Sequence, residues 1–147
     1  MTSITEGLYD WLQACPLIDG NYMGVNYLED GPLTFSLEEA PSQAVRSRYI
    51  AGSTPGSESS VREFDFILAS RESYSADALE NLRVSGLYER LVAWMEAQNA
   101  EGVLPALPAG MTARKVLPTT NGYALQTDPL SQKQRYQIQC KLTYYKE

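Results

Sequence analysis

Hydrophobic and polar positions alternate most regularly near the C-terminus of the chain. Between Arg135 and Tyr145, apolar or aromatic side chains occupy every second position, and mostly polar side chains occupy the positions between them. This period of two predicts an antiparallel strand with one face against the core and the other against solvent. The side chains expected on the inner face are Tyr136, Ile138, Cys140, Leu142 and Tyr144.

The beginning of the chain has a helical period instead. Ser3 and Glu6 have the spacing of a capping box, in which the serine caps the amide of the glutamate. Pro16 marks the end of the helix, because proline cannot continue it. One face of this helix is expected to carry Ile4, Leu8, Trp11, Leu12 and Cys15.

Strand patterns and turn residues follow the helix. Residues 21–28, 33–37, 44–51 and 61–70 are each predicted to form a strand. In the second of these strands, Leu33, Phe35 and Leu37 are expected on one face. Residues 52–60 contain no large apolar side chain, and we expect them to form a flexible hairpin loop.

The strand predicted at 61–70 has two unlike faces. Phe64, Phe66 and Leu68 are expected on one face, against Glu63, Asp65 and Ile67 on the other.

The central part of the chain then predicts a pair of helices. A first helix begins near Ala76, capped by Ser73 or Ser75, with Ala78, Leu79 and Leu82 on its inner side.

Ser85 and Gly86 interrupt the helical pattern, so a break or kink is expected there. A second helix is predicted over residues 86–100. Its apolar stripe is Leu87, Leu91, Trp94 and Met95, with Tyr88 and Val92 beside it.

Residues 99–110 contain two glycines and two prolines and predict an irregular connection. Residues 112–117 and 123–127 are extended by propensity. They are compatible with a hairpin or with one long strand that carries a bulge. This order of elements predicts an α+β fold with a mainly antiparallel sheet of four to six strands. The N-terminal helix and the central helix pair are expected on one face of the sheet, within a single domain over residues 1–147.

The composition excludes several kinds of chemistry. The chain contains no histidine, so neither a Ser-His-Asp triad nor a His-ligated metal site can form within it. Cys15 and Cys140 are far apart in the sequence, and both are interpreted as buried, reduced thiols that could lie close together. No apolar run approaches the roughly 20 residues that cross a bilayer, so no membrane partner is expected.

No residue is assigned a catalytic, cofactor-binding or metal-binding role, and the chain is not expected to be an enzyme. Trp11 and Trp94 lie on apolar helix stripes and are interpreted as core residues. Glu38 and Glu39 are interpreted as a solvated loop pair. Glu63 and Asp65 share a strand face without a third ligand, which favours an exposed polar face over a metal site.

Charge is distributed unevenly along the chain. The formal net charge is −6, which argues against a surface that binds nucleic acid. Residues 1–45 contain seven acidic and no basic side chains, whereas residues 111–147 contain six basic side chains and two acidic ones. These unlike parts could pair within one fold, or they could form complementary patches that meet head-to-tail between copies.

Three segments resemble a family of small prophage-encoded proteins whose genes lie among the head–tail genes of long-tailed phages. They are MTSITEGLYDWL at residues 1–12, FDFILASRESY at 64–74 and RYQIQCKLTYY at 135–145. The resemblance covers almost the whole chain and the order of its elements, without a diagnostic motif.

The resemblance implies a structural protein of the virion tail or neck, assembled in the host bacterial cytoplasm. The implied protein is similar to tail terminators, which form a ring, commonly a hexamer, at the end of the tail tube. The implied partners are further copies of the chain, the tail tube protein and the head–tail connector, with DNA only passing through the channel. The alternatives are another neck or minor capsid protein, or a non-viral α+β domain that binds a small molecule.

Overall fold

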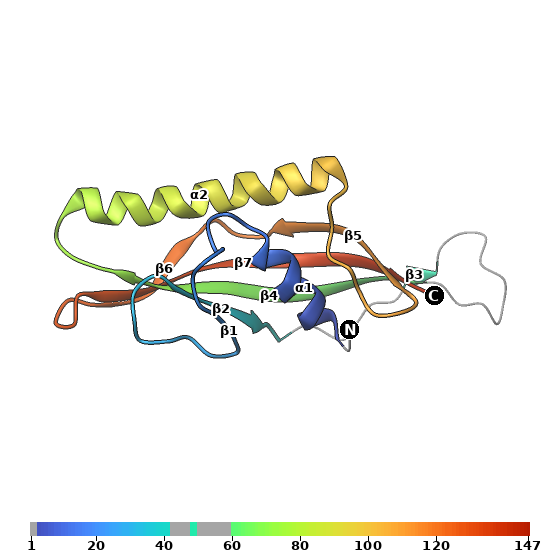
Figure 1. The fold of residues 1–147 in the computed structure, drawn as a ribbon, viewed down its shortest axis with the longest axis horizontal. Coiled ribbons are helices and arrows are strands. Elements are labelled where there is room, and N and C mark those ends of the chain that lie inside the picture. The colour runs from blue at the N-terminus through green and yellow to red at the C-terminus, as the bar shows by residue number, and fades with distance from the viewer. Residues whose placement is uncertain (1–2, 42–47, 50–59) are drawn as a thin grey trace.

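The structure, a computed structural model, describes residues 3–41, 48–49 and 60–147 (Figure 1). In these residues, two helices combine with a mainly antiparallel sheet. The elements in chain order are α1 (Ile4–Gln13), β1 (Met23–Val25), β2 (Thr34–Glu39), β3 (Arg48–Tyr49), β4 (Ser60–Ser73), α2 (Ala78–Glu101), β5 (Met111–Pro118), β6 (Tyr123–Asp128) and β7 (Lys133–Lys146).

Two long antiparallel strands, β4 and β7, form the centre of the sheet. Each has 14 residues, and they pair along their whole length, from Ser60 opposite Lys146 to Ser73 opposite Lys133. Strands β2 and β3 pair with β4 on its other side, and β1 is parallel to β2. Six strands have three or more residues, and every pairing except β1–β2 is antiparallel. The α+β class, the mainly antiparallel sheet and the strand number are therefore confirmed.

Strands β5 and β6 follow one another along the outer side of β7. Met111 pairs with Lys146 at the start of β5, and Pro118 pairs with Cys140 at its end. Strand β6 then continues in the same direction, from Tyr123 opposite Gln137. The two strands do not form a hairpin with each other. They are closer to the second alternative, a single long edge interrupted by residues 119–122, with register shifts within both strands.

The core lies on the face of the sheet that carries the large apolar side chains. Phe66 of β4 is opposite Cys140 of β7, Leu68 is opposite Ile138, and all four are buried. The buried side chains of α1 and α2 belong to the same hydrophobic cluster as these strand residues. The inner faces predicted for residues 64–68 and for the C-terminal strand are thus confirmed.

The two tryptophans pack together where α1 meets α2. Their ring centroids are 4.7 Å apart, and the indole N–H of Trp11 donates to the carbonyl oxygen of Val103 at 2.9 Å. Both belong to or pack against the hydrophobic cluster, as expected from the sequence. Cys15 and Cys140 are buried free thiols in the same cluster, and burial raises the pKa of each.

The predicted N-terminal helix is confirmed, with Ser3 as its cap. The Ser3 hydroxyl accepts a hydrogen bond from the backbone N–H of Glu6 at 3.1 Å. Gly7 of α1 faces the connection between α2 and β5. A Cβ atom at that position would lie 2.2 Å from the carbonyl oxygen of Ala106, so only glycine permits this approach.

The predicted helix pair is wrong, because α2 is one continuous helix of 24 residues. It passes through Ser85 and Gly86 without a break. A glycine within a helix costs about 1 kcal/mol relative to alanine. The burial of Val84 and Leu87 on either side of these residues outweighs that cost.

The start and inner side of this helix also differ from expectation. Its cap is Asp77, whose carboxylate accepts from the N–H of Leu79, rather than Ser73 or Ser75. Leu79 and Leu82 were expected inside, but their side chains are 76% and 63% exposed. The buried stripe is Val84, Leu87, Tyr88, Leu91 and Met95. When the spacing of this stripe is extended towards the N-terminus of α2, positions 79 and 82 lie on the side of the helix that faces solvent.

Several strands in the first half differ from their predicted bounds. Of the strand expected at residues 21–28, only Met23–Val25 forms β1. Leu33 does not join the inner face, because its φ of 62° places it in a turn and leaves it 49% exposed. The strand predicted at 44–51 and the loop predicted at 52–60 lie largely outside the described residues. Of these positions, Arg48 and Tyr49 form β3 and Ser60 begins β4.

Candidate functional site

Within the described part of the chain no further strand pairs with the two lateral edges of the sheet. On the β1 side, the Tyr9 hydroxyl of α1 donates to the carbonyl oxygen of Met23 at 3.2 Å. The order of strands runs from β1 through β2, β4 and β7 to β5, and β6 extends the β5 side. Unpaired strand edges present backbone donors and acceptors to which another chain can pair. These edges are therefore the first candidates for a contact with another molecule.

The edge formed by β1 and the residues beside it is aromatic and acidic. Tyr22 is 51% exposed, Tyr27 is 58% exposed and Val25 lies exposed between them. Asp19 and Asp30 are exposed in the segments that lead into and out of β1. Asp30 lies away from this edge, because it lines a depression together with Arg71 of β4 and Gln126 of β6. We call the other four residues the β1 edge.

The opposite edge, in β5, is basic. Thr112, Arg114 and Lys115 have exposed side chains, and we call these three residues the β5 edge. The Arg114 guanidinium lies 5.7 Å from the centre of the Tyr145 ring, in cation–π geometry that orients the charged group. The acidic N-terminal part of the sequence thus supplies the β1 edge, and the basic C-terminal part supplies the β5 edge.

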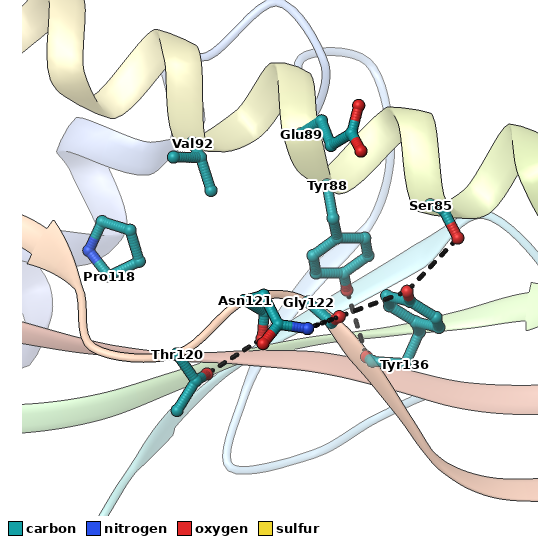
Figure 2. A pocket seen from close by; sticks show the side chains of 9 residues that line it. All are labelled: Ser85, Tyr88, Glu89, Val92, Pro118, Thr120, Asn121, Gly122 and Tyr136. Carbon is teal, nitrogen blue, oxygen red and sulfur yellow. Dashed lines mark hydrogen bonds between the residues drawn. The ribbon is translucent and has the colours of Figure 1, made fainter.

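A groove of about 490 Å³ lies between α2 and the connection from β5 to β6 (Figure 2). Val92 of α2 and Pro118 of β5 line one part of it, and the two tyrosines Tyr88 and Tyr136 line another. Glu89 is the one charged side chain in its lining. The rest of the lining is formed by Ser85, Thr120, Asn121 and Gly122.

The floor of this groove is held by hydrogen-bonded tyrosines. The Tyr88 hydroxyl lies 2.6 Å from the Ser70 hydroxyl and donates to the carbonyl oxygen of Tyr136 at 3.0 Å. The Tyr136 hydroxyl donates to the carbonyl oxygen of Gly122 at 3.3 Å (Figure 2). Burial raises the pKa of Tyr88 far above its usual range, so this hydroxyl stays neutral and acts only in hydrogen bonding.

Gly122 allows the groove to form. A Cβ atom at this position would lie 2.7 Å from the Cβ of Tyr88 and 2.8 Å from its Cγ. Any other residue would therefore push the β5–β6 connection away from α2. The groove can hold an apolar group through packing, but its lining places no nucleophile beside a base.

A second depression, of about 540 Å³, is polar. It lies between the segment after β1 and the β6–β7 hairpin. Arg71 of β4 crosses it, and its Nε donates to the carbonyl oxygen of Glu29 at 3.3 Å. The lining residues are Asp30, Arg71, Gln126, Thr127, Asp128, Ser131 and Lys133, whose mixed charges are typical of a solvated surface.

A carboxylate is buried between β4 and the first turns of α2. The Glu72 side chain is fully buried, its Oε1 accepts from Nη2 of Arg83 at 3.3 Å, and its Oε2 has no hydrogen-bond partner. Burial raises the pKa of Glu72, and the nearby Ser70 and Arg83 only partly oppose this effect. Burial therefore disfavours the ionised form of Glu72.

The acidic residues weighed in the sequence lie in strands and have partners. Glu38 and Glu39 are in β2 rather than in a loop, so the interpretation as a solvated loop pair is wrong. Glu38 forms a two-point ion pair with Arg135 at 2.6 and 3.1 Å, and Glu39 accepts from the Thr5 hydroxyl at 2.8 Å. Glu63 pairs with Lys141 at 3.1 Å, and this hydrogen bond raises the pKa of Lys141.

The described residues contain no group of three or more acidic or cysteine side chains placed to hold a metal ion. No helix among them is long and apolar enough to span a bilayer. Comparison with models of protein families and with curated proteins finds no match for this chain.

Sequence reasoning missed the residues that build the groove. Tyr88 was expected beside the apolar stripe but is 2% exposed, and Asn121 and Gly122 lie between the two segments predicted to be extended. The contact between Tyr88 and Gly122 joins residues 34 positions apart. A hydrophobic period within one element gives no information about such a contact. The one available signal was the glycine, since a glycine after asparagine marks either a turn or a close approach of the backbone.

Proposed function

We propose that this chain is a structural protein of a long-tailed phage, a tail terminator whose copies form a ring at the end of the tail tube. The ring would end the growth of the tube and join it to the head–tail connector, and DNA would only pass through its channel. In this proposal the protein works in the virion tail or neck, after assembly in the host cytoplasm, and has no catalytic role.

The observation that carries the proposal is the opposite charge of the two lateral edges. The β1 edge presents Asp19, and the β5 edge presents Arg114 and Lys115. When unlike surfaces of the same molecule are complementary, copies join head-to-tail, and such contacts close into a ring where the rotation permits. The exposed tyrosines of the β1 edge supply the apolar part that a stable contact needs.

The resemblance of the sequence to phage head–tail proteins supplies the biological setting. Another neck or minor capsid protein would use the same head-to-tail contact, and the position of the protein in the particle separates the two roles. The negative net charge fits both roles, because an acidic subunit does not retain the DNA that passes it.

Two charge-reversed variants, studied alone and mixed, test the contact. The first carries Arg114→Glu and Lys115→Glu on the β5 edge, and the second carries Asp19→Lys on the β1 edge. Each variant alone would face like charges across every contact, so we expect both to stay monomeric in light scattering after size exclusion. In an equimolar mixture, alternation of the two variants restores unlike charges at every contact, so rings with an even number of subunits should assemble.

A matched control is Glu96→Lys, which reverses an exposed charge on α2 away from both edges. This variant should assemble like the unaltered protein. Unaltered protein that stays monomeric at high concentration and never joins purified tail tubes would contradict the proposed function. Assembly of either reversed variant by itself would show that the edges are not the contact.

A further inference from the structure

Asn121 and Gly122 lie side by side in the connection between β5 and β6. Of the five asparagines in the sequence, Asn121 alone is followed by glycine. In such a pair the backbone nitrogen of the glycine can attack the side-chain amide carbon of the asparagine, because glycine has no Cβ to obstruct the approach. Asn121 is also exposed to water, which the reaction consumes.

The Asn121 side chain is turned towards the residue that follows it. Its Nδ2 donates to the carbonyl oxygen of Gly122 at 2.8 Å (Figure 2). This hydrogen bond keeps the side-chain amide beside Gly122 instead of extended into solvent, so the amide carbon Cγ stays near the backbone nitrogen of that residue. Holding two reacting groups together in this way lowers the entropic part of the activation barrier.

The backbone around Gly122 is fixed, but its nitrogen is free to react. The Tyr136 hydroxyl donates to the carbonyl oxygen of Gly122 at 3.3 Å, and the Thr120 hydroxyl donates to that of Asn121 at 2.9 Å. Within the part of the chain that the structure describes, the N–H of Gly122 donates no hydrogen bond. An N–H paired in a sheet would first have to lose its hydrogen bond, which carries a cost in free energy. This nitrogen needs no such step.

We propose that Asn121 and Gly122 form a modification site at which the folded protein deamidates without an enzyme. The Gly122 nitrogen forms a bond to Cγ of Asn121, the bond from Cγ to Nδ2 breaks, and Nδ2 leaves as ammonia with the proton from the glycine nitrogen. Water then opens the resulting five-membered succinimide at either carbonyl carbon, which gives aspartate or isoaspartate at position 121. The net reaction consumes one water and releases one ammonia.

Both products would change the groove beneath α2. Each adds a carboxylate to a lining in which Glu89 is the one charged side chain. In isoaspartate the main chain also passes through Cβ, which adds one backbone atom directly before Gly122. A Cβ on Gly122 would already lie 2.7 Å from Tyr88, so the longer main chain should separate the connection from α2. This inference goes beyond the proposed function and does not depend on self-association.

The first test follows the reaction in the folded protein by peptide mapping and mass spectrometry. Aspartate and isoaspartate should accumulate at position 121, faster as the pH is raised, because the glycine nitrogen must lose its proton to attack. The rate should lie within about tenfold of that in a free peptide of residues 119–125, since a geometry that prevented the attack would slow it by about 100-fold or more. Slower conversion than this, or none, would overturn the proposal.

Asn99 is a control within the same molecule. Its side-chain amide forms three hydrogen bonds with Met95 and Val116 at 2.7 to 2.8 Å, and alanine follows it in the sequence. It should remain unchanged while Asn121 converts. Equal conversion at the two positions would show that the geometry of Asn121 and Gly122 has no part in the reaction.

The second test compares aged proteins by their melting temperature. Asn121→Gln should not convert in the same period, because its longer side chain would have to close a six-membered ring. The unaltered protein should lose melting temperature on incubation, and Asn121→Gln should keep it. Asp19 and Asp30 also precede glycines, but both proteins contain them, so any change there cancels. Equal losses in the two proteins would overturn the effect on the groove.

A third protein, Asn121→Asp, separates the added charge from the longer main chain. It carries the carboxylate with an ordinary backbone, so before incubation it should melt closer to the fresh unaltered protein than the aged protein does. If Asn121→Asp melted as low as the aged protein, separation of the connection by isoaspartate would be disproved.

Discussion

Single residues decide how closely the layers of this protein approach. Gly7 lets α1 contact the backbone at Ala106, and Gly122 lets the β5–β6 connection lie on the Tyr88 side chain. Glu72 has the opposite character, because it places a carboxylate in the interior with one ion-pair partner and one unbonded oxygen. Each of these features can be tested by a change of a few atoms.

Gly7→Ala should destabilise the protein, although alanine is the better helix former. By propensity alone the change would stabilise α1 by up to about 1 kcal/mol. The added Cβ would lie 2.2 Å from a backbone oxygen, however, so α1 must shift, and we expect a loss of about 1–3 kcal/mol. Urea unfolding measures the difference.

The control for this change is Gly86→Ala in α2. A Cβ there would meet only a guanidinium nitrogen of Arg90, at 3.9 Å. This variant should be as stable as the unaltered protein or more stable by up to about 1 kcal/mol. If both alanine variants were stabilised alike, the close contact of Gly7 would be disproved.

Glu72→Gln should change how stability depends on pH. The pKa of Glu72 is raised in the folded state by burial, so the folded protein binds this proton more tightly than the unfolded chain does. The contribution of Glu72 to stability therefore becomes more favourable as pH falls through the folded pKa towards the ordinary value of 4.5. Glutamine does not titrate. The stability of the unaltered protein relative to the variant should therefore rise as the pH is lowered over this range.

Urea unfolding of both proteins, from about pH 7 to about pH 4, measures this relative stability. Other carboxylates titrate equally in both proteins and cancel from the comparison. A stability difference that is constant over the range would show that Glu72 is not held in an unfavourable environment.

At the scale of elements, the fold depends on the long β4–β7 pair and on the unbroken α2. The two strands share fourteen paired positions, and their inner faces supply many of the fully buried side chains. Helix α2 covers this face with one stripe over its central and C-terminal turns, from Val84 to Met95. Its first turns instead hold exposed leucines and the partner of Glu72.

Leu142→Asp tests the inner face of β7. The leucine is fully buried, opposite Phe64 of β4 and Val116 of β5. An aspartate there would be a buried charge without a partner, so we expect a loss of several kcal/mol and a large fall in melting temperature. Gln139→Asp, on the exposed side of the same strand, should melt close to the unaltered protein. Unchanged melting of Leu142→Asp would show that the face is assigned wrongly.

At the scale of the whole molecule, the proposed self-association depends on where the exposed charges lie on the sheet. The sheet is extended along β4 and β7, with the β6–β7 turn at one end (Figure 1). Asp19 lies on its β1 side, and Arg114 and Lys115 lie in β5 on the other side.

Residues 52–59 provide a test of assembly that does not depend on the core. They have no large apolar side chain, so replacing them by a two-residue turn should leave the melting temperature of the monomer nearly unchanged. If the segment contacts a neighbour, light scattering should show the loss of the ring, and joining to tail tubes should fail. Normal assembly of the shortened chain would exclude this role.

The sequence by itself determined the features that depend on neighbouring residues. The alternation over residues 135–145 predicted the strand and its inner face, and the serine at position 3 predicted the cap of α1. The order of elements was enough for the α+β class and the antiparallel sheet. Local periods and caps report these features because they arise from repeating geometry within one element.

The tertiary structure alone decided which elements meet and how closely. It placed β5 and β6 in line along β7, joined Glu38 to Arg135 across 97 positions, and kept α2 straight through Gly86. It also built the groove from Tyr88 and Gly122. These outcomes depend on packing between distant segments, whose free energy outweighs local propensity and leaves no period in the sequence.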